Sequence, residues 1–126
     1  MIRERALKIL LLFVGLACLA GLYPLMGALR DGVASTINRQ DQMILSIYIS
    51  LGVFLLIAVR NPREHRSLIL FAGWSTVAHD GVMIVQGIQH HDLRGDLLGF
   101  SIIAVIGVAL IALTPAKLPR AGAAAA

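Results

Sequence analysis

The stretch "MILSIYISLGVFLLIAVRNPREHRSLILFAGWSTVAHDGVMIVQ", Met43 to Gln86, holds two apolar runs that a short basic loop separates. Each run approaches the length of about 20 residues that a helix needs to cross a hydrocarbon core roughly 30 Å thick. Pro62 ends the first run, because the residue before a proline disfavours helical backbone. Since the loop is short, we expect the two helices to be antiparallel neighbours.

Two further apolar runs flank this pair, which gives four predicted spans at residues 6–29, 43–59, 67–89 and 97–114. The composition agrees, because 58% of the residues are hydrophobic and 14% are charged, with a mean hydropathy of +0.83. Soluble domains carry about 25% charged residues. The sequence predicts an all-α fold, a four-transmembrane-helix bundle in one membrane domain, followed by a disordered tail at residues 115–126.

The first span contains two local signals. Pro24 lacks a backbone N–H group and predicts a kink in the outer third of this helix. Ala17 and Gly21 are small residues four positions apart, a spacing that lets another helix pack closely.

The net charge of +4 does not indicate a nucleic-acid partner, because the cations flank the apolar runs and form no separate basic face. In a four-span topology three cations fall on one side: Arg30, Arg39 and Arg94. Eight fall on the other: Arg3, Arg5, Lys8, Arg60, Arg63, Arg66, Lys117 and Arg120. The positive-inside rule therefore predicts that both termini and the 60–66 loop are cytoplasmic.

Several segments together resemble a bacterial family of small four-helix integral membrane proteins, a domain of unknown function. The matching segments are "LYPL" at 22–25, "LSIY" at 45–48, "LGVFLL" at 51–56, "RNPREHRSLI" at 60–69, "WSTVAH" at 74–79 and "AVIGVALIAL" at 104–113. The resemblance implies four spans in a bacterial inner (cytoplasmic) membrane, and it implies no activity. It also implies a small residue after the histidine of the third span, where this chain has Asp80.

The third span carries the ionisable pair His79 and Asp80 near its midpoint. An ionised aspartate at the bilayer centre costs roughly 2.5–3.5 kcal/mol on insertion scales, so a buried one marks a candidate functional site. We expect His79 to face the bundle interior and Asp80 to be protonated or hydrogen-bonded to a neighbouring helix. Tyr48 and Ser50 of the second span lie at a similar depth and are the expected partners.

Ser75, His79 and Gln86 form one polar stripe of the third span, and Thr76 shares a face with Asp80. Two interpretations stay open for these groups and for Tyr48 and Ser50. They line a small polar cavity that opens to the periplasm, or they hydrogen-bond helix to helix. The cofactor is left open, and no metal site is predicted.

The sequence contains no nucleophile motif, no glycine-rich phosphate loop, no CxxC and no HExxH. We therefore expect a non-enzymatic accessory subunit or partner-binding protein that contacts the lipid bilayer and joins a larger membrane complex or a homo-oligomer. The alternative is a cavity protein that binds a quinone-like molecule or a tetrapyrrole through His79.

Overall fold

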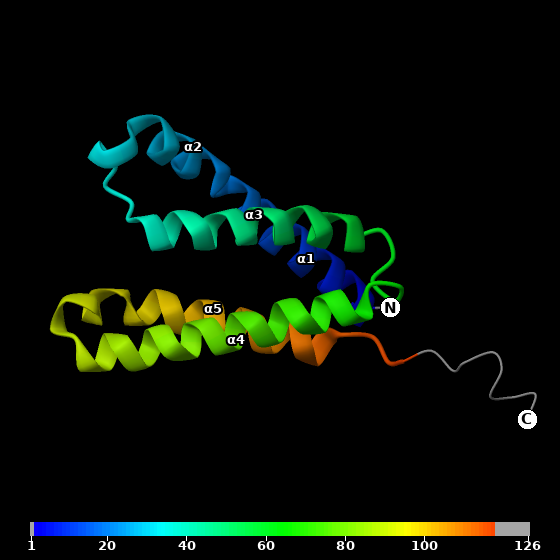
Figure 1. The fold of residues 1–126 in the computed structure, drawn as a ribbon. Coiled ribbons are helices and arrows are strands. Elements are labelled where there is room, and N and C mark those ends of the chain that lie inside the picture. The colour runs from blue at the N-terminus through cyan, green and yellow to red at the C-terminus, as the bar shows by residue number, and fades with distance from the viewer. Residues whose placement is uncertain (1, 118–126) are drawn as a thin grey trace, which may run out of the picture. The chain divides into compact units, whose positions relative to one another are not determined.

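The structure, a computed structural model, describes residues 2–117, and this part of the chain is helical without a strand. Its elements are α1 (Ile2–Ala20), α2 (Leu22–Asp31), the 3-10 helix η1 (Gly32–Ala34), α3 (Arg39–Ala58), α4 (Arg66–Gln89), the 3-10 helix η2 (His91–Asp96) and α5 (Leu97–Leu113) (Figure 1). Four segments are long and apolar enough to cross a membrane: Ile2–Ala34, Arg39–Ala58, Arg66–Gln89 and His91–Leu113. The predicted all-α fold with four spans is confirmed to this extent.

The chain divides into two compact units, which are described separately. One unit comprises residues 8–61, and the other comprises residues 1–7 together with residues 62–126. The predicted pairing of the second and third spans joins the two units and stays a prediction. The predicted disordered tail falls largely on residues 118–126, outside the described part, and residues 115–117 form no regular element.

In the unit of residues 8–61, the first span is broken where the sequence predicts a kink. The helix stops at Ala20 and restarts at Leu22, so that Pro24 lies in the first turn of α2, where its missing N–H group costs little. The N–H of Gly21 donates to the Cys18 carbonyl oxygen at 3.2 Å, which tightens the last turn of α1.

In the same unit, α1 and α3 approach each other at a pair of glycines. A β-carbon placed at Gly52 would lie 2.9 Å from the Gly15 carbonyl oxygen and 2.8 Å from the β-carbon of Cys18. Glycine is therefore the residue that fits at this crossing, because any side chain would separate the two backbones.

The connection between α2 and α3 is shorter than predicted, because α3 begins at Arg39 and not at residue 43. Asn38 caps this helix: its side-chain oxygen accepts a 2.8 Å hydrogen bond from the Asp41 N–H. The Asn38 amide also donates to the Asp41 carboxylate at 2.8 Å. This reciprocal capping adds a polar first turn that a search for apolar runs does not detect.

In the other unit, α4 and α5 form an antiparallel hairpin that η2 connects (Figure 1). A β-carbon placed at Gly73 would lie 2.9 Å from the Gly107 carbonyl oxygen, so the two backbones touch at this pair of glycines. Gly87 packs against Leu97 near the connection. The observed bounds of these two helices match the predicted spans to within one residue.

Two arginines join three chain segments at one end of this hairpin. Arg3 donates to the carbonyl oxygens of Ala112 at 2.7 Å and Thr114 at 3.2 Å. Arg66 donates from Nε to the Pro115 carbonyl oxygen at 2.9 Å. These carbonyls at the end of α5 lack partners within the helix, and the arginines supply them together with a favourable charge.

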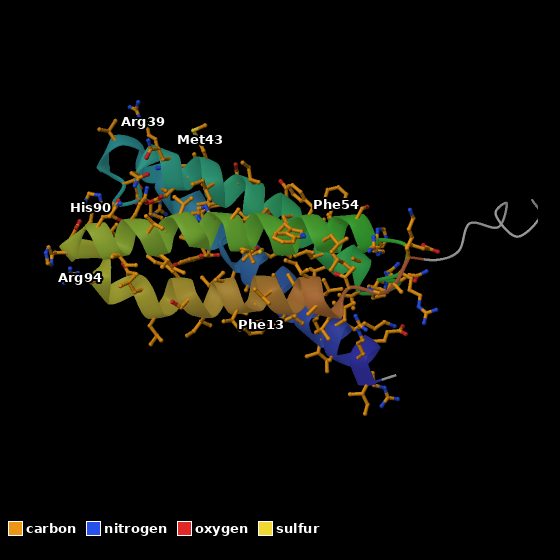
Figure 2. All side chains as sticks on the ribbon, turned by 90° about the horizontal axis from the view of Figure 1, so that it is seen from below. Phe13, Arg39, Met43, Phe54, His90 and Arg94 are labelled. Atoms are coloured by element: carbon orange, nitrogen blue, oxygen red, sulfur yellow. The ribbon has the colours of Figure 1, made fainter. Side chains whose placement is uncertain are left out.

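Apolar side chains cover the outside of all four spans. In the apolar window of each span, between 11% and 28% of the residues are buried. Met43 and Phe54, for example, are exposed and point away from α3, and Phe13 of α1 is also exposed (Figure 2). Such surfaces are compatible with a hydrocarbon environment.

Candidate functional site

Asp80 and Thr76 are the two buried polar residues in the middle of α4. Their exposed fractions are 3% and 8%, and they lie four residues apart on one face of the helix. Asp80 therefore does not face the outside of the molecule, as the sequence predicts. It lies near the middle of Arg66–Gln89, a helix long and apolar enough to cross a membrane, and the bilayer centre is the least favourable depth for a carboxyl group.

The carboxyl group of Asp80 is incompletely satisfied. Its Oδ2 atom is buried and has no hydrogen-bond partner within residues 2–117. The predicted hydrogen bond to a neighbouring helix is thus not found for this atom. An unsatisfied buried polar atom costs about 1–3 kcal/mol.

The close crossing of α4 and α5 fixes the surroundings of this face. A β-carbon placed at Gly107 would lie 3.2 Å from the Thr76 β-carbon and 3.0 Å from Val77 Cγ2. The backbone of α5 thus packs directly on Thr76. Asp80 follows one helical turn later, about 6 Å along the axis of α4.

The other predicted residues of α4 are less buried than Asp80. His79 and Ser75 are half-buried, and Gln86 is exposed. The Ser75 hydroxyl donates to the Ala72 carbonyl oxygen of its own helix at 3.1 Å. The stripe of Ser75, His79 and Gln86 therefore points further outward than the face of Thr76 and Asp80.

Tyr48 and Ser50 belong to α3, in the other unit. Tyr48 is half-buried, whereas Ser50 is exposed and donates to the Ser46 carbonyl oxygen at 3.0 Å. The hydroxyl groups of Ser46 and Ser101 also donate hydrogen bonds to backbone carbonyl oxygens of their own helices. These serines are satisfied locally. The predicted pairing of Tyr48 or Ser50 with His79 stays a prediction.

The histidines near the end of α4 lie at the connection to α5. His90 and His91 are exposed, as is Asp92 beside them, and Figure 2 shows His90 at the same end of the hairpin as Arg94. Within residues 2–117, no group of three or more His, Cys, Asp or Glu side chains is arranged to hold a metal ion.

The sequence does not reveal which glycines make the helix crossings. Gly15, Gly52, Gly73 and Gly107 are all buried at helix contacts, but no local pattern distinguishes them from the other helical glycines. Ala17 and Gly21, the small residues predicted to allow close helix packing, do not form such a pair within the described part of the chain. Ala17 is exposed, and Gly21 faces the side chain of Leu45.

The comparison with known families gives one match, to a family of unknown function (DUF6632), over residues 3–124. No curated protein and no solved structure matches the chain.

Proposed function

The chain belongs to this family of unknown function, and we propose that it is a bacterial inner-membrane protein that acts as a non-enzymatic accessory subunit. It crosses the membrane four times, with both termini in the cytoplasm, and packs against a larger membrane complex or a further copy of itself. The orientation rests on the distribution of cations. Arg3 and Arg66 lie at the same end of the α4–α5 hairpin, where they bind the carbonyls that follow α5.

One observation carries the proposal of a docked partner: the helical glycines fall into two groups. Gly15, Gly52, Gly73 and Gly107 meet another helix within the chain, whereas a β-carbon placed at Gly27, Gly81 or Gly99 would meet nothing within 4 Å. A glycine inside a helix costs about 1 kcal/mol relative to alanine. In membranes this cost is offset where a second helix approaches closely.

The open glycines fit a partner helix and not lipid alone. Gly27 and Gly99 belong to α2 and α5, in the first and fourth spans. Lipid chains adapt to any side chain and gain nothing from a missing one. A helix backbone gains van der Waals contact at such a position, which is the usual basis of association between transmembrane helices.

Co-purification in a mild detergent tests this function. Tagged wild-type protein is expected to bring down a stoichiometric membrane protein or a second copy. Gly99→Leu should abolish this co-purification. Val108→Leu should not, because Val108 is an exposed residue of α5 on another face than Gly99. A thermal melt of each variant separates lost docking from lost folding. Equal loss with both variants, or no partner for the wild type, contradicts the proposal.

The orientation has its own test, which uses reporters fused after Ala126. A reporter that is active only in the cytoplasm should be active there, and one that is active only in the periplasm should be silent. The opposite pair of results excludes a cytoplasmic C-terminus.

The unsatisfied Oδ2 atom of Asp80 favours a second candidate function, the binding of a lipophilic molecule such as a quinone or a tetrapyrrole beside His79. A quinol hydroxyl or a pyrrole N–H would donate to Oδ2, whereas a quinone carbonyl oxygen would accept a hydrogen bond from the protonated carboxyl group. Solvent extraction of the purified protein should then release a small molecule that His79→Leu abolishes without unfolding the protein. An extract of the wild type that contains only phospholipid excludes this candidate.

A further inference from the structure

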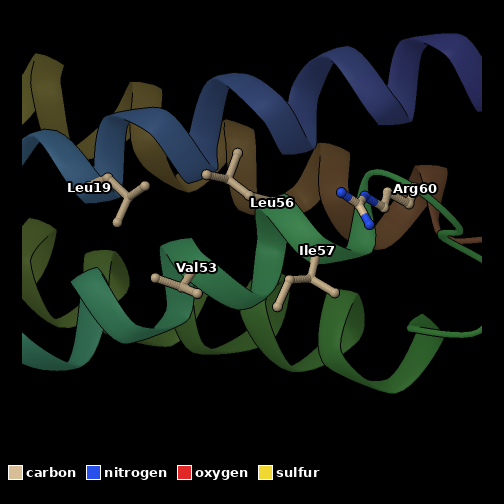
Figure 3. A pocket seen from close by; sticks show the side chains of 5 residues that line it. All are labelled: Leu19, Val53, Leu56, Ile57 and Arg60. Atoms are coloured by element: carbon tan, nitrogen blue, oxygen red, sulfur yellow. The ribbon is translucent and has the colours of Figure 1, made fainter.

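A groove of about 390 Å³ lies in the unit of residues 8–61, and no residue of α4 lines it. Four aliphatic side chains and one arginine line it: Leu19, Val53, Leu56, Ile57 and Arg60. Figure 3 shows Leu19 at one end of the groove and Arg60 at the other, with the aliphatic residues between them. The groove is thus apolar along its length and cationic at one end.

The crossing of α1 and α3 explains where the groove lies. Leu56 fills the crossing, since its Cδ2 atom would lie 2.8 Å from a β-carbon placed at Gly15. The two helices cross at an angle and are not parallel (Figure 1). Val53 and Ile57, one helical turn apart on α3, therefore remain partly exposed beside the crossing.

The dimensions of the groove match part of a lipid chain. Val53 and Ala58, the last residue of α3, are five residues apart, which corresponds to about 8 Å along a helix, and Arg60 follows in the next turn. One leaflet contributes about 15 Å of hydrocarbon, half of the bilayer core. The groove therefore extends from the end of α3 over much of the depth of one leaflet, and its aliphatic walls offer a soluble polar ligand no hydrogen bond.

The charge at the end of the groove indicates an anion. Arg60 is exposed just beyond the last residue of α3. A guanidinium group can bind a phosphate through two parallel hydrogen bonds.

We propose that this groove binds one anionic phospholipid, with an acyl chain along Val53 and Ile57 and the phosphate on Arg60. The site is on the side that carries most of the cations, where the positive-inside rule places the cytoplasmic leaflet. An anionic headgroup is attracted to that side, and the acyl chain replaces hydrocarbon contacts that the helix crossing leaves open.

Native mass spectrometry of the protein released from bilayers tests the headgroup contact. The bilayers contain equal amounts of phosphatidylglycerol and phosphatidylcholine, and the retained lipids are counted at a fixed collision energy. Wild-type protein should retain phosphatidylglycerol preferentially. Arg60→Gln should weaken this retention about tenfold or more, the effect of losing a hydrogen bond between a charged donor and the phosphate.

Arg5→Gln is the matched control, because it removes an exposed charge that the positive-inside rule assigns to the same side, and Arg5 does not line the groove. It should leave the retention of phosphatidylglycerol unchanged. An equal loss for Arg5→Gln and Arg60→Gln would show diffuse attraction to the membrane surface and would overturn the proposed site. Equal retention of both lipids by the wild type would overturn it as well.

Filling the groove tests the acyl-chain contact independently. Val53→Trp places a large ring in the groove and should lower phosphatidylglycerol retention, whereas Phe54→Trp changes a neighbouring exposed residue that does not line it. Both variants should keep the wild-type unfolding temperature. Unchanged retention in Val53→Trp would overturn the proposal. Neither result depends on a protein partner, so the accessory-subunit function is tested separately.

Discussion

Gly73 and Gly107 are in backbone contact across the α4–α5 hairpin. A β-carbon at Gly73 would lie 2.9 Å from the Gly107 carbonyl oxygen, and a β-carbon at Gly107 would lie 3.0 Å from the Gly73 carbonyl oxygen. Such reciprocal proximity allows weak Cα–H···O contacts between the helices and excludes any larger side chain at either position. This pair therefore determines how closely α5 packs on Thr76.

Gly107→Ala is expected to destabilise the hairpin by about 1–3 kcal/mol, the usual cost of overpacking a close contact. The new methyl group would meet the backbone of Gly73, which cannot move aside as a flexible side chain can. Denaturant unfolding in detergent, followed by helical circular dichroism, measures the change. The control is Gly99→Ala, which has open space and should be neutral or stabilising by about 0.5–1 kcal/mol. The same free energy of unfolding for both variants would contradict this packing.

The arginines at the end of α5 give a second prediction. Arg66→Ala should lower the free energy of unfolding by about 1 kcal/mol, because it removes a part-buried charged donor from the Pro115 carbonyl oxygen. Arg63→Ala is the control. The Arg63 side chain is more than half exposed, and its guanidinium group lies 4.0 Å from the Glu4 carboxylate. Exposed ion pairs of this kind contribute about 0–1 kcal/mol, so Arg63→Ala should lower the free energy of unfolding by only a small part of 1 kcal/mol. A larger loss of stability in Arg63→Ala than in Arg66→Ala would contradict this role of Arg66.

Asp80 gives a third prediction. Asp80→Ala should raise the free energy of unfolding by about 1 kcal/mol or more, because it removes a buried oxygen without a hydrogen-bond partner and introduces a better helix former. Asp92→Ala, at an exposed position, should stay within about 0.5 kcal/mol of the wild type. Unfolding by denaturant in the same detergent compares the two variants. A clear loss of stability in Asp80→Ala would show that the carboxyl group is stabilised by its surroundings and is not an open acceptor.

The sequence predicts the helices of this protein well, because length and apolar composition depend only on neighbouring residues. The bounds of α4 and α5 agree with the predicted spans, and Pro24 correctly indicates the break in the first span. The early start of α3 is missed because Asn38 and Asp41 stabilise a polar turn, which a criterion of apolar length leaves out.

The contacts between helices are less accessible to sequence reasoning, since they depend on which faces meet. The chain has 12 glycines, and only the structure separates Gly73 and Gly107 from Gly81 and Gly99. The buried position of Asp80 follows from the cost of exposing it to lipid, whereas the lack of a partner for Oδ2 depends on the packing around it. Likewise, the positive-inside rule predicts the side on which Arg3 and Arg66 lie but not the carbonyls that they bind.

Site-specific cross-linking in native membranes tests the proposed docking surface most directly. Cys18 is the only cysteine, so Cys18→Ala provides a background in which Gly99→Cys or Val108→Cys carries a single reactive thiol. After treatment with a thiol-directed photo-cross-linker, we expect one discrete adduct of higher mass for Gly99→Cys and none for Val108→Cys. No adduct at either position, or the same diffuse products at both, would contradict the claim that this protein is an accessory subunit docked through its open glycines.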